Sequence, residues 1–331
     1  MQYVNLGRSG LKVSRLCLGT MNFGPSTDEA TSFAIMDEAL TQGIQFFDTA
    51  NTYGGKATEE IIGRWFKQSG QRDAVVLATK FQGSTGPGPN DRGASAYNIR
   101  QACDASLRRL QTDHIDLYQM HHCNRDVPWD EYWQAMDVLI QQGKIIYTGS
   151  SNFAGWQIAS ANEAARQKNL LGLVSEQHRF SLLCRWAQLE VLPAARAYGV
   201  GVITYSPLAS GILGGPATET AGRRGGNPKH EATRTRLQTQ LGPWEELCAQ
   251  LGHAPANVAL AWQLNFPMIT APIIGPRTVA QVKDVLDAVT IKLDAPTLAR
   301  LDEIFPPVAD PEIQKWMKGP YRLESPEAYA W

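Results

Sequence analysis

The chain has 331 residues, with 31 lysines and arginines against 32 aspartates and glutamates, and a formal net charge of -1. A chain of this length can bury a large core, as one large barrel or as two ordinary domains. Its basic residues are scattered and no apolar run approaches the length of a membrane helix, so the sequence argues against nucleic-acid and membrane partners. We therefore expect a soluble protein.

The N-terminal residues lack a cationic start followed by a long apolar region, so no secretory signal is predicted and a cytoplasmic location is expected. The five cysteines are odd in number and contain no Cys-x-x-Cys pair. This pattern argues against a disulfide framework and against a zinc site. We expect reduced thiols and no bound metal.

The first elements predicted along the chain are a small hairpin and a buried strand. Residues 3–6 and 11–14 alternate in polarity on either side of a Gly-Arg-Ser-Gly turn, which predicts an antiparallel hairpin that caps the main fold. Residues 15–20 form the first buried strand. Ser26 and Glu29 then fit a capping box for a helix that ends near Thr41.

The second buried strand ends at Asp48, which follows Phe46 and Phe47 and precedes a turn of small residues with Tyr53 and two glycines. A buried carboxylate is costly unless it is paired, so Asp48 needs a cation nearby. A further apolar run, residues 74–79, ends at Lys80. An ordinary ion pair and a loop tyrosine would explain these residues taken singly.

The alternation of helix and strand continues to about residue 288. Further helices are predicted at 57–67, 96–110, 131–141, 156–167, 188–197, 236–251, 255–265 and 278–288, and further strands at 115–120, 145–149, 171–175, 200–204 and 268–274. Repeating strand-helix units of roughly 30 to 40 residues predict a closed (β/α)8 TIM barrel rather than an open sheet. A Rossmann domain is disfavoured, because no Gly-x-Gly-x-x-Gly follows a strand.

The expected organisation is therefore one domain over residues 1–331, made of a hairpin cap (1–15), the barrel (16–290) and a C-terminal helix and tail (291–331). The tail from Phe305 is rich in proline and aromatic residues, and either folds over the barrel mouth or acts as a clasp. A Gly-rich loop after the seventh strand contains Arg223 and Arg224, which either lock over bound phosphates or are solvated.

Polar residues follow successive strands of the predicted barrel, and in this architecture the catalytic groups sit at the C-terminal ends of the strands. A structural role would account for any one of them, but six in succession predict a ring around one site. They are Asp48, Lys80, His121, Asn152, Gln177 and Ser206.

Several ordered segments together resemble the aldo-keto reductase superfamily, and the match runs from the hairpin to about Ala288. The segments are Leu6–Ser14, Leu18–Met21, Phe47–Ala50 with Tyr53–Gly54, Thr79–Lys80, Asp116–His121, Gly149–Phe153, Tyr205–Leu208 and Ile274–Arg277. Within the superfamily the chain is similar to bacterial members, to the potassium-channel beta subunits and to the deoxysugar reductase branch.

The resemblance implies a catalytic tetrad of Asp48, Tyr53, Lys80 and His121. Tyr53 would be the general acid for the alkoxide that forms when a nicotinamide hydride attacks a carbonyl carbon. Lys80 is expected to lower the pKa of Tyr53 while Asp48 keeps the ammonium charged and oriented. His121 would polarise the carbonyl oxygen. His122 competes for that role, but strand alternation predicts that it points away as a satisfied structural histidine.

The resemblance also implies NADPH as the cofactor. It places Ser151, Asn152 and Gln177 on the nicotinamide carboxamide, Tyr205 against the ring, and Ser206, Leu208 and Gly211 along the pyrophosphate. Gly275 and Arg277 begin the last helix as an anion site, and Arg277 would bind the 2'-phosphate. Gln281 would lie near the adenine, and Gly19, Thr20 and Met21 within the cofactor site. A plain helix N-terminus with a surface arginine is the alternative for Arg277. The chain departs from the family at Val285, which stands for an asparagine, at Phe180-Ser181, where relatives often have Tyr-Asn, and at His122.

The function implied is NADPH-dependent reduction of an aldehyde or ketone. The residues predicted to rim the mouth form a mainly aromatic wall with few charges, which favours aromatic aldehydes and keto-sugars over small keto acids. They are Met21, Phe23, Tyr53, Phe81, His122 and Trp129, with Trp316, Tyr321, Tyr329 and Trp331 of the tail as possible lids. One alternative is a nucleotide-binding regulatory subunit with little turnover. Another is a barrel lyase or isomerase without nicotinamide. The sequence leaves the oligomeric state, the physiological substrate and the direction of reaction open.

Overall fold

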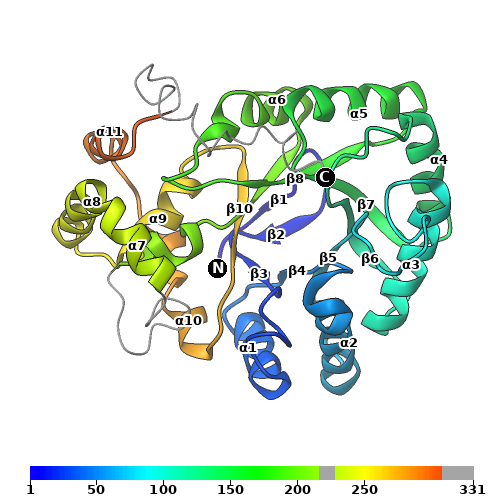
Figure 1. Cartoon of the computed structure of the whole chain (residues 1–331), viewed down its shortest axis with the longest axis horizontal. Helices are drawn as coiled ribbons and strands as arrows, with labels where there is room; N and C mark the ends of the chain where they lie inside the picture. The colour runs from blue at the N-terminus through cyan, green and yellow to red at the C-terminus, as the bar shows by residue number, and fades with distance from the viewer. Residues whose placement is uncertain (216–227, 308–331) are drawn as a thin grey trace.

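The computed structural model describes residues 1–215 and 228–307 (Figure 1). In this part of the chain parallel strands close into a barrel in the ring order β10-β3-β4-β5-β6-β7-β8-β9. The strands are β3 (Cys17–Gly19), β4 (Phe46–Asp48), β5 (Val76–Phe81), β6 (Ile115–Met120), β7 (Ile145–Ser151), β8 (Leu173–Arg179), β9 (Gly201–Tyr205) and β10 (Ile269–Ile274). The predicted (β/α)8 TIM barrel is confirmed.

Helices surround the strands, as Figure 1 shows. They are α1 (Glu29–Thr41), α2 (Ala57–Ser69), α3 (Ala96–Leu110), α4 (Trp129–Gln141), α5 (Gly155–Gln167), α6 (Val191–Tyr198), α7 (Pro228–Arg236), α8 (Gln238–Leu251), α9 (Pro255–Leu264), α10 (Val279–Lys283) and α11 (Ala295–Ile304). Among the described residues, no helix combines the length and the apolar character that crossing a membrane requires.

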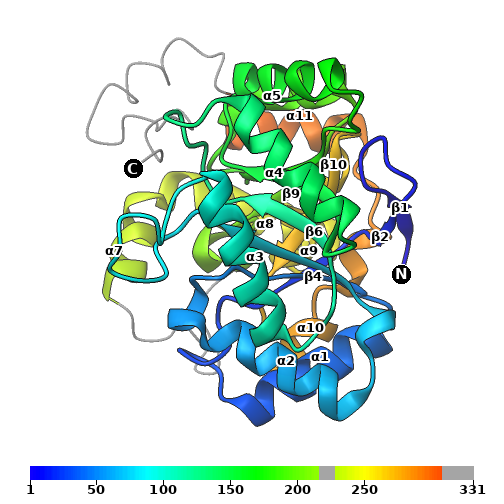
Figure 2. The same cartoon turned by 90° about the vertical axis from the view of Figure 1, so that its right-hand side faces the viewer.

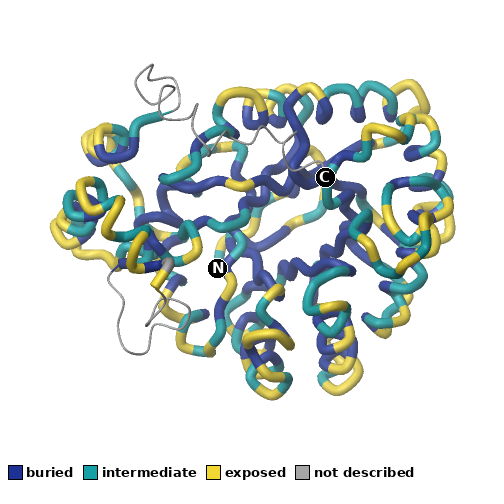
Figure 3. The backbone as a smooth tube through the Cα atoms, viewed as in Figure 1, coloured by how far each residue is buried: buried dark blue, intermediate teal, exposed yellow. Residues whose placement is uncertain are grey.

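The core has two layers, because alternate strand residues point into the barrel and out toward the helices. Figure 3 shows the strands buried and the outer faces of the helices exposed. Phe46, Ala78, Leu117 and Ile203 belong to the inner cluster. The outer cluster contains Phe47, which packs on Trp65 of α2 with 5.8 Å between ring centroids. Each fully buried Phe contributes about 1.5–3 kcal/mol.

A hairpin of β1 (Tyr3–Asn5) and β2 (Lys12–Ser14) closes the N-terminal end of the barrel, as predicted. The turn places Gly7 at a φ of +55°, where an added Cβ would lie 2.4 Å from the carbonyl oxygen of Val174. Only glycine fits so close an approach. In Figure 2 the hairpin lies on one side of the barrel and α7 on the other, so the hairpin and α7 lie at opposite ends of the barrel.

Two local predictions are wrong. The cap of α1 is Asp28, whose side chain accepts a hydrogen bond from the Thr31 N–H at 2.8 Å, and not the Ser26/Glu29 capping box. The single helix predicted over 278–288 is divided between α10 and a 3-10 turn at Leu286–Val289. The amide of Asn257 bonds the Asp284 carbonyl and the Ala288 N–H, and so replaces helical hydrogen bonds there.

The strand predicted at 171–175 has shifted ends: β8, the sixth strand of the barrel, runs to Arg179, so Gln177 lies within a strand rather than after one. Arg223 and Arg224, and the tail aromatic residues from Trp316 onward, lie outside the described residues. The domain boundaries at residues 15 and 290 stay predictions.

Candidate active site

A cavity of about 600 Å³ lies at the C-terminal ends of the strands, and the predicted site residues gather around it. Those that line it are Gly19, Thr20, Met21, Asp48, Tyr53, His121, Ser151, Asn152, Gln177, Tyr205, Ser206, Leu208, Gly211, Gly275, Arg277 and Gln281. Lys80, the remaining member of the predicted set, is fully buried and contacts Asp48 and Tyr53. The ring of polar strand ends therefore forms one site.

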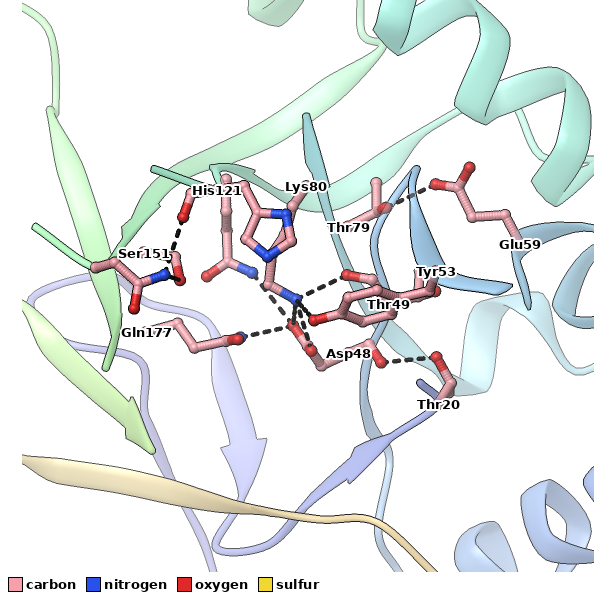
Figure 4. Close-up of polar contacts among 12 residues, drawn as sticks. Thr20, Asp48, Thr49, Tyr53, Glu59, Thr79, Lys80, His121, Ser151 and Gln177 are labelled. Atoms are coloured by element: carbon pink, nitrogen blue, oxygen red, sulfur yellow. Dashed lines mark hydrogen bonds and ion pairs between the residues drawn. The ribbon is translucent and has the colours of Figure 1, made fainter. Parts of the chain in front are cut away.

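Asp48 ends β4 and finds its cation on the neighbouring strand β5, as its burial requires. The Lys80 ammonium donates to both carboxylate oxygens, at 2.9 and 2.7 Å, and to the Thr49 carbonyl at 2.9 Å (Figure 4). Both side chains are almost inaccessible to solvent, at 0% and 3% exposure. Removing one partner of a buried pair costs about 3–5 kcal/mol, because the other charge is left uncompensated.

Two amides complete the surroundings of the Asp48 carboxylate. Gln177 Nε2 donates to Oδ1 at 2.7 Å, and Gln119 Nε2 donates to the same oxygen at 3.3 Å. Gln119 was not among the predicted site residues, although a buried amide within β6 is a signal that could have identified it. Together with Lys80, these donors fix the orientation of the carboxylate.

Tyr53 begins a 3-10 turn (Tyr53–Lys56) in which Gly54 and Gly55 have φ values of +55° and +63°. This left-handed turn, which glycine adopts without strain, aims the phenol at Lys80. The ammonium donates to the Tyr53 hydroxyl at 3.2 Å and lies 4.9 Å from the ring centroid.

The electrostatics of the pair differ from the expectation for Tyr53. Burial raises the pKa of Tyr53 above 10.0, and the opposing effect of Lys80 does not overcome it. Lys80 therefore lowers the pKa of Tyr53 as expected, but burial has the larger effect. Burial also opposes the charge on Lys80, but Asp48 and Tyr53 outweigh it and raise the pKa of Lys80 above its ordinary value. Lys80 is thus an ammonium that faces a protonated phenol at neutral pH.

His121 and His122 follow β6 directly, and both line the cavity. The ring of His121 lies edge-on to Tyr53, with centroids 5.9 Å apart and an interplanar angle of 76°. Burial, then Lys80 and His122, lower the pKa of His121 well below 6.5. The imidazole is therefore neutral at neutral pH and offers one N–H donor beside the Tyr53 hydroxyl.

The prediction that His122 points away from the site as a satisfied structural histidine is wrong. Its ring stacks on His121 with centroids 5.0 Å apart and 12° between the planes, rather than pointing to the opposite face. Its Nδ1 atom is buried without a hydrogen-bond partner, so it is not a satisfied structural histidine. Strand alternation fails here because β6 ends at Met120.

Ser151 ends β7, and Asn152 follows it beside the histidines. Asn152 has a φ of +59°, and its Nδ2 donates to the His121 carbonyl and to Ser151 Oγ, each at 3.1 Å. The Tyr205 hydroxyl donates to Asn152 Oδ1 at 2.8 Å. These bonds tie the ends of β6, β7 and β9 together and place polar groups and one aromatic ring along the cavity wall.

The wall after β9 is built from strained backbone. Ser206, Ala209 and Ser210 have φ values of +53°, +48° and +57°, and Gly211 follows at +95°. Each non-glycine residue in this region costs about 1–2 kcal/mol, so the surrounding contacts must hold the loop. Gln263 supplies one of them by donating to the Pro207 carbonyl at 3.1 Å.

Arg277 and Gln281 line the cavity after β10, which lies opposite β6 in the ring. The Arg277 N–H donates to Gln281 Oε1 at 2.8 Å, and Thr278 caps α10. Asn22 joins this wall to the loop after β3 through a 3.0 Å bond to the Gly275 carbonyl.

Lining residues that were not predicted include Asn22, Ser210, Ala256 and Asp284, which carry no local signal in the sequence.

The predicted aromatic mouth is only partly correct. Met21, Tyr53 and His122 line the cavity, whereas Phe23 and Phe81 are fully buried in the core. Trp129 packs against the same core, and its indole N–H donates to Ser160 Oγ at 2.6 Å.

Comparison with known proteins agrees with this geometry. The sequence model of the Aldo/keto reductase family matches residues 15–305. Over the full length of both proteins the chain is 55% identical to an uncharacterized oxidoreductase, YrpG, of Bacillus subtilis. It is 34% identical to a probable voltage-gated potassium channel subunit beta of Arabidopsis thaliana, over 88% of this chain and 92% of that protein. It is 30% identical to versiconal hemiacetal acetate reductase of Aspergillus parasiticus, over 93% and 98%.

Proposed function

This chain belongs to the aldo/keto reductase family of oxidoreductases, and from that premise we propose that it uses NADPH to reduce an aldehyde or a ketone to the alcohol. The observation that carries the proposal is the closed contact set of Asp48, Lys80 and Tyr53, with the His121 ring beside the phenol. Tyr53 is the proton donor, Lys80 is the cation that contacts it, and the neutral His121 is a hydrogen-bond donor beside it.

The residues around the cavity fit a nicotinamide dinucleotide phosphate. Gln177 uses its amide nitrogen on Asp48, which leaves its carbonyl oxygen available to a carboxamide N–H. The backbone of Ser206 to Gly211 approaches the cavity closely. Arg277 supplies a cation suited to a phosphate, on the wall opposite the histidines. Val285 lines the same cavity and offers the adenine end no hydrogen bond.

The chemistry that the bound cofactor supplies is a hydride, transferred with its electron pair to the carbonyl carbon. The protein supplies the proton and the stabilisation of charge. The neutral His121 donates a hydrogen bond to the carbonyl oxygen, where negative charge develops. Tyr53 gives its hydroxyl proton to that oxygen, and the alcohol forms. Lys80 stabilises the resulting phenolate, while Asp48 keeps the ammonium charged and in place.

A second candidate function is a nucleotide-binding regulatory subunit, which the similarity to probable channel beta subunits raises. Such a protein would hold the nucleotide and turn over negligibly. The complete set of Asp48, Tyr53, Lys80 and His121 favours the reductase, because a binding module needs no proton donor beside its ligand.

The test is the removal of the Tyr53 hydroxyl. Tyr53→Phe should lower the rate of aldehyde reduction at least roughly 100-fold and leave NADPH affinity, measured by fluorescence titration, within about threefold of the parent. Tyr97→Phe, on the exposed side of α3, is the matched control and should change neither quantity. A Tyr53→Phe variant that keeps more than about a tenth of the turnover would require another acid.

The substrate class can be tested with three compounds under one condition. We propose that 4-nitrobenzaldehyde and a keto-sugar give higher kcat/KM values than a 2-keto acid. A clear preference for the acid would contradict this proposal.

A further inference from the structure

His122 lies beside the imidazole assigned to the carbonyl oxygen, lines the same cavity, and has no part in the chemistry proposed above. Its ring is nearly parallel to that of His121, with centroids 5.0 Å apart and 12° between the planes. Both side chains come from consecutive residues after β6, so the structure presents two imidazoles side by side at one wall of the site.

The two nitrogens of His122 have different surroundings. Nδ1 is buried and has no hydrogen-bond partner, whereas Nε2 is not one of the buried, unpartnered atoms of the described residues. An N–H buried without an acceptor is costly, whereas an unpaired lone pair costs less, so we assign the proton to Nε2. Burial lowers the pKa of His122, so the ring is neutral at neutral pH. His122 therefore offers the cavity one N–H donor.

A donor next to the carbonyl-binding histidine is useful for a particular class of substrate. The His121 N–H binds the carbonyl oxygen, and a second oxygen on the adjacent carbon lies within a few ångströms of the first, on the scale of the 5.0 Å between the rings. A substrate with no second oxygen leaves the His122 N–H without an acceptor once water is displaced.

We propose that His122 is a specificity-determining residue that hydrogen-bonds an oxygen on the carbon next to the reacting carbonyl. The substrate class is then 2-hydroxy aldehydes and hydroxyketones, which include open-chain sugars. This inference rests on the proposed reductase function and on His121 as the ligand of the carbonyl oxygen.

The experiment compares two substrates that differ by one hydroxyl, propanal and 2-hydroxypropanal, in the parent and in two variants. His122→Phe keeps a flat ring to stack on His121 and removes the donor. His122→Asn keeps an N–H donor and removes the stacking. The ratio of kcat/KM for the two substrates is the readout, and a fluorescence titration checks that NADPH affinity is unchanged.

We expect His122→Phe to lower kcat/KM for 2-hydroxypropanal roughly three- to tenfold. The kcat/KM for propanal should stay within about twofold of the parent value. His122→Asn should keep most of the preference for the hydroxylated substrate. An equal loss on both substrates in His122→Phe, or no loss on either, overturns the role of His122. The reductase function itself fails by a different result, namely a parent protein that binds NADPH and reduces neither aldehyde.

Discussion

The two halves of the site are built in different ways. On the β4–β5–β6 side, Asp48 and Lys80 are fully buried and bond each other, Tyr53 and neighbouring amides at distances of 2.7–3.3 Å. On the β9–β10 side, the wall consists of left-handed loop residues and a partly exposed Arg277. The first half is held by buried side-chain contacts, whereas the second half presents backbone and the Arg277 side chain to the cavity.

Because of this difference, substitutions in the two halves should affect stability, turnover and ligand affinity differently. Changes on the β4–β5–β6 side should damage both stability and turnover, because the same contacts hold the fold and perform the chemistry. Changes on the β9–β10 side should alter ligand affinity with little effect on folding, because few buried contacts are lost.

The largest effect is expected for Lys80→Met, which leaves the Asp48 carboxylate buried without its cation. Turnover should fall at least roughly 100-fold, and the free energy of unfolding should drop by about 3–5 kcal/mol. Urea unfolding monitored by tryptophan fluorescence measures the second quantity. Lys144→Met removes a more exposed ion pair, Lys144 with Asp104 at 2.7 Å, and should cost less than about 1 kcal/mol.

The double variant Asp48→Asn with Lys80→Met separates charge from chemistry. Removing both charges should recover part of the lost stability, because no buried charge is then unpaired, and activity should stay absent. Equal stability of the single and double variants would show that the ion pair does not hold the two strands together.

Asp48 and Lys80 could be singled out from the sequence, since each follows an apolar run at a strand end, and the structure brings them together. The sequence was insufficient where a contact joins distant segments. Gln119 becomes part of the site only because β6 lies next to β5 in the barrel, and the helix after β10 divides because Asn257, on α9, bonds its backbone. Likewise, the direction of His122 depends on where β6 ends, and alternation alone does not give that end.

The next largest effect is expected on the other side of the site, for Arg277→Ala. A charge-assisted phosphate contact is worth about 1.5–3 kcal/mol, so NADPH binding should weaken at least roughly tenfold. NADH lacks that phosphate, and its affinity should barely change. Fluorescence titrations with both cofactors measure this. Arg64→Ala, which breaks an exposed pair with Glu29, is the control. Equal losses for NADPH and NADH would refute the assignment of Arg277.

A smaller, pH-dependent effect is expected at His121. Burial, then Lys80 and His122, depress the pKa of His121 in the folded protein below 6.5, so the unfolded chain binds a proton there more readily. The contribution of His121 to stability is then complete above pH 6.5 and is lost as the pH falls toward the folded pKa. His121→Asn should flatten the decline of unfolding free energy below pH 6.5. An unchanged slope would place the acid sensitivity elsewhere.

The smallest effects are expected in the left-handed loop after β9, where adjacent residues should respond in opposite directions. Gly211 has a φ of +95°, so Gly211→Ala introduces a Cβ into a conformation that costs about 1–2 kcal/mol, and NADPH affinity should fall a few-fold. Ser210 has a φ of +57° and is exposed, so Ser210→Gly should relieve strain and raise the unfolding free energy by up to about 1 kcal/mol. Parallel unfolding and NADPH titrations of the two variants measure this. If Ser210→Gly also weakens NADPH binding, the strained backbone itself shapes the phosphate wall, and the two halves of the site are more alike than their burial indicates.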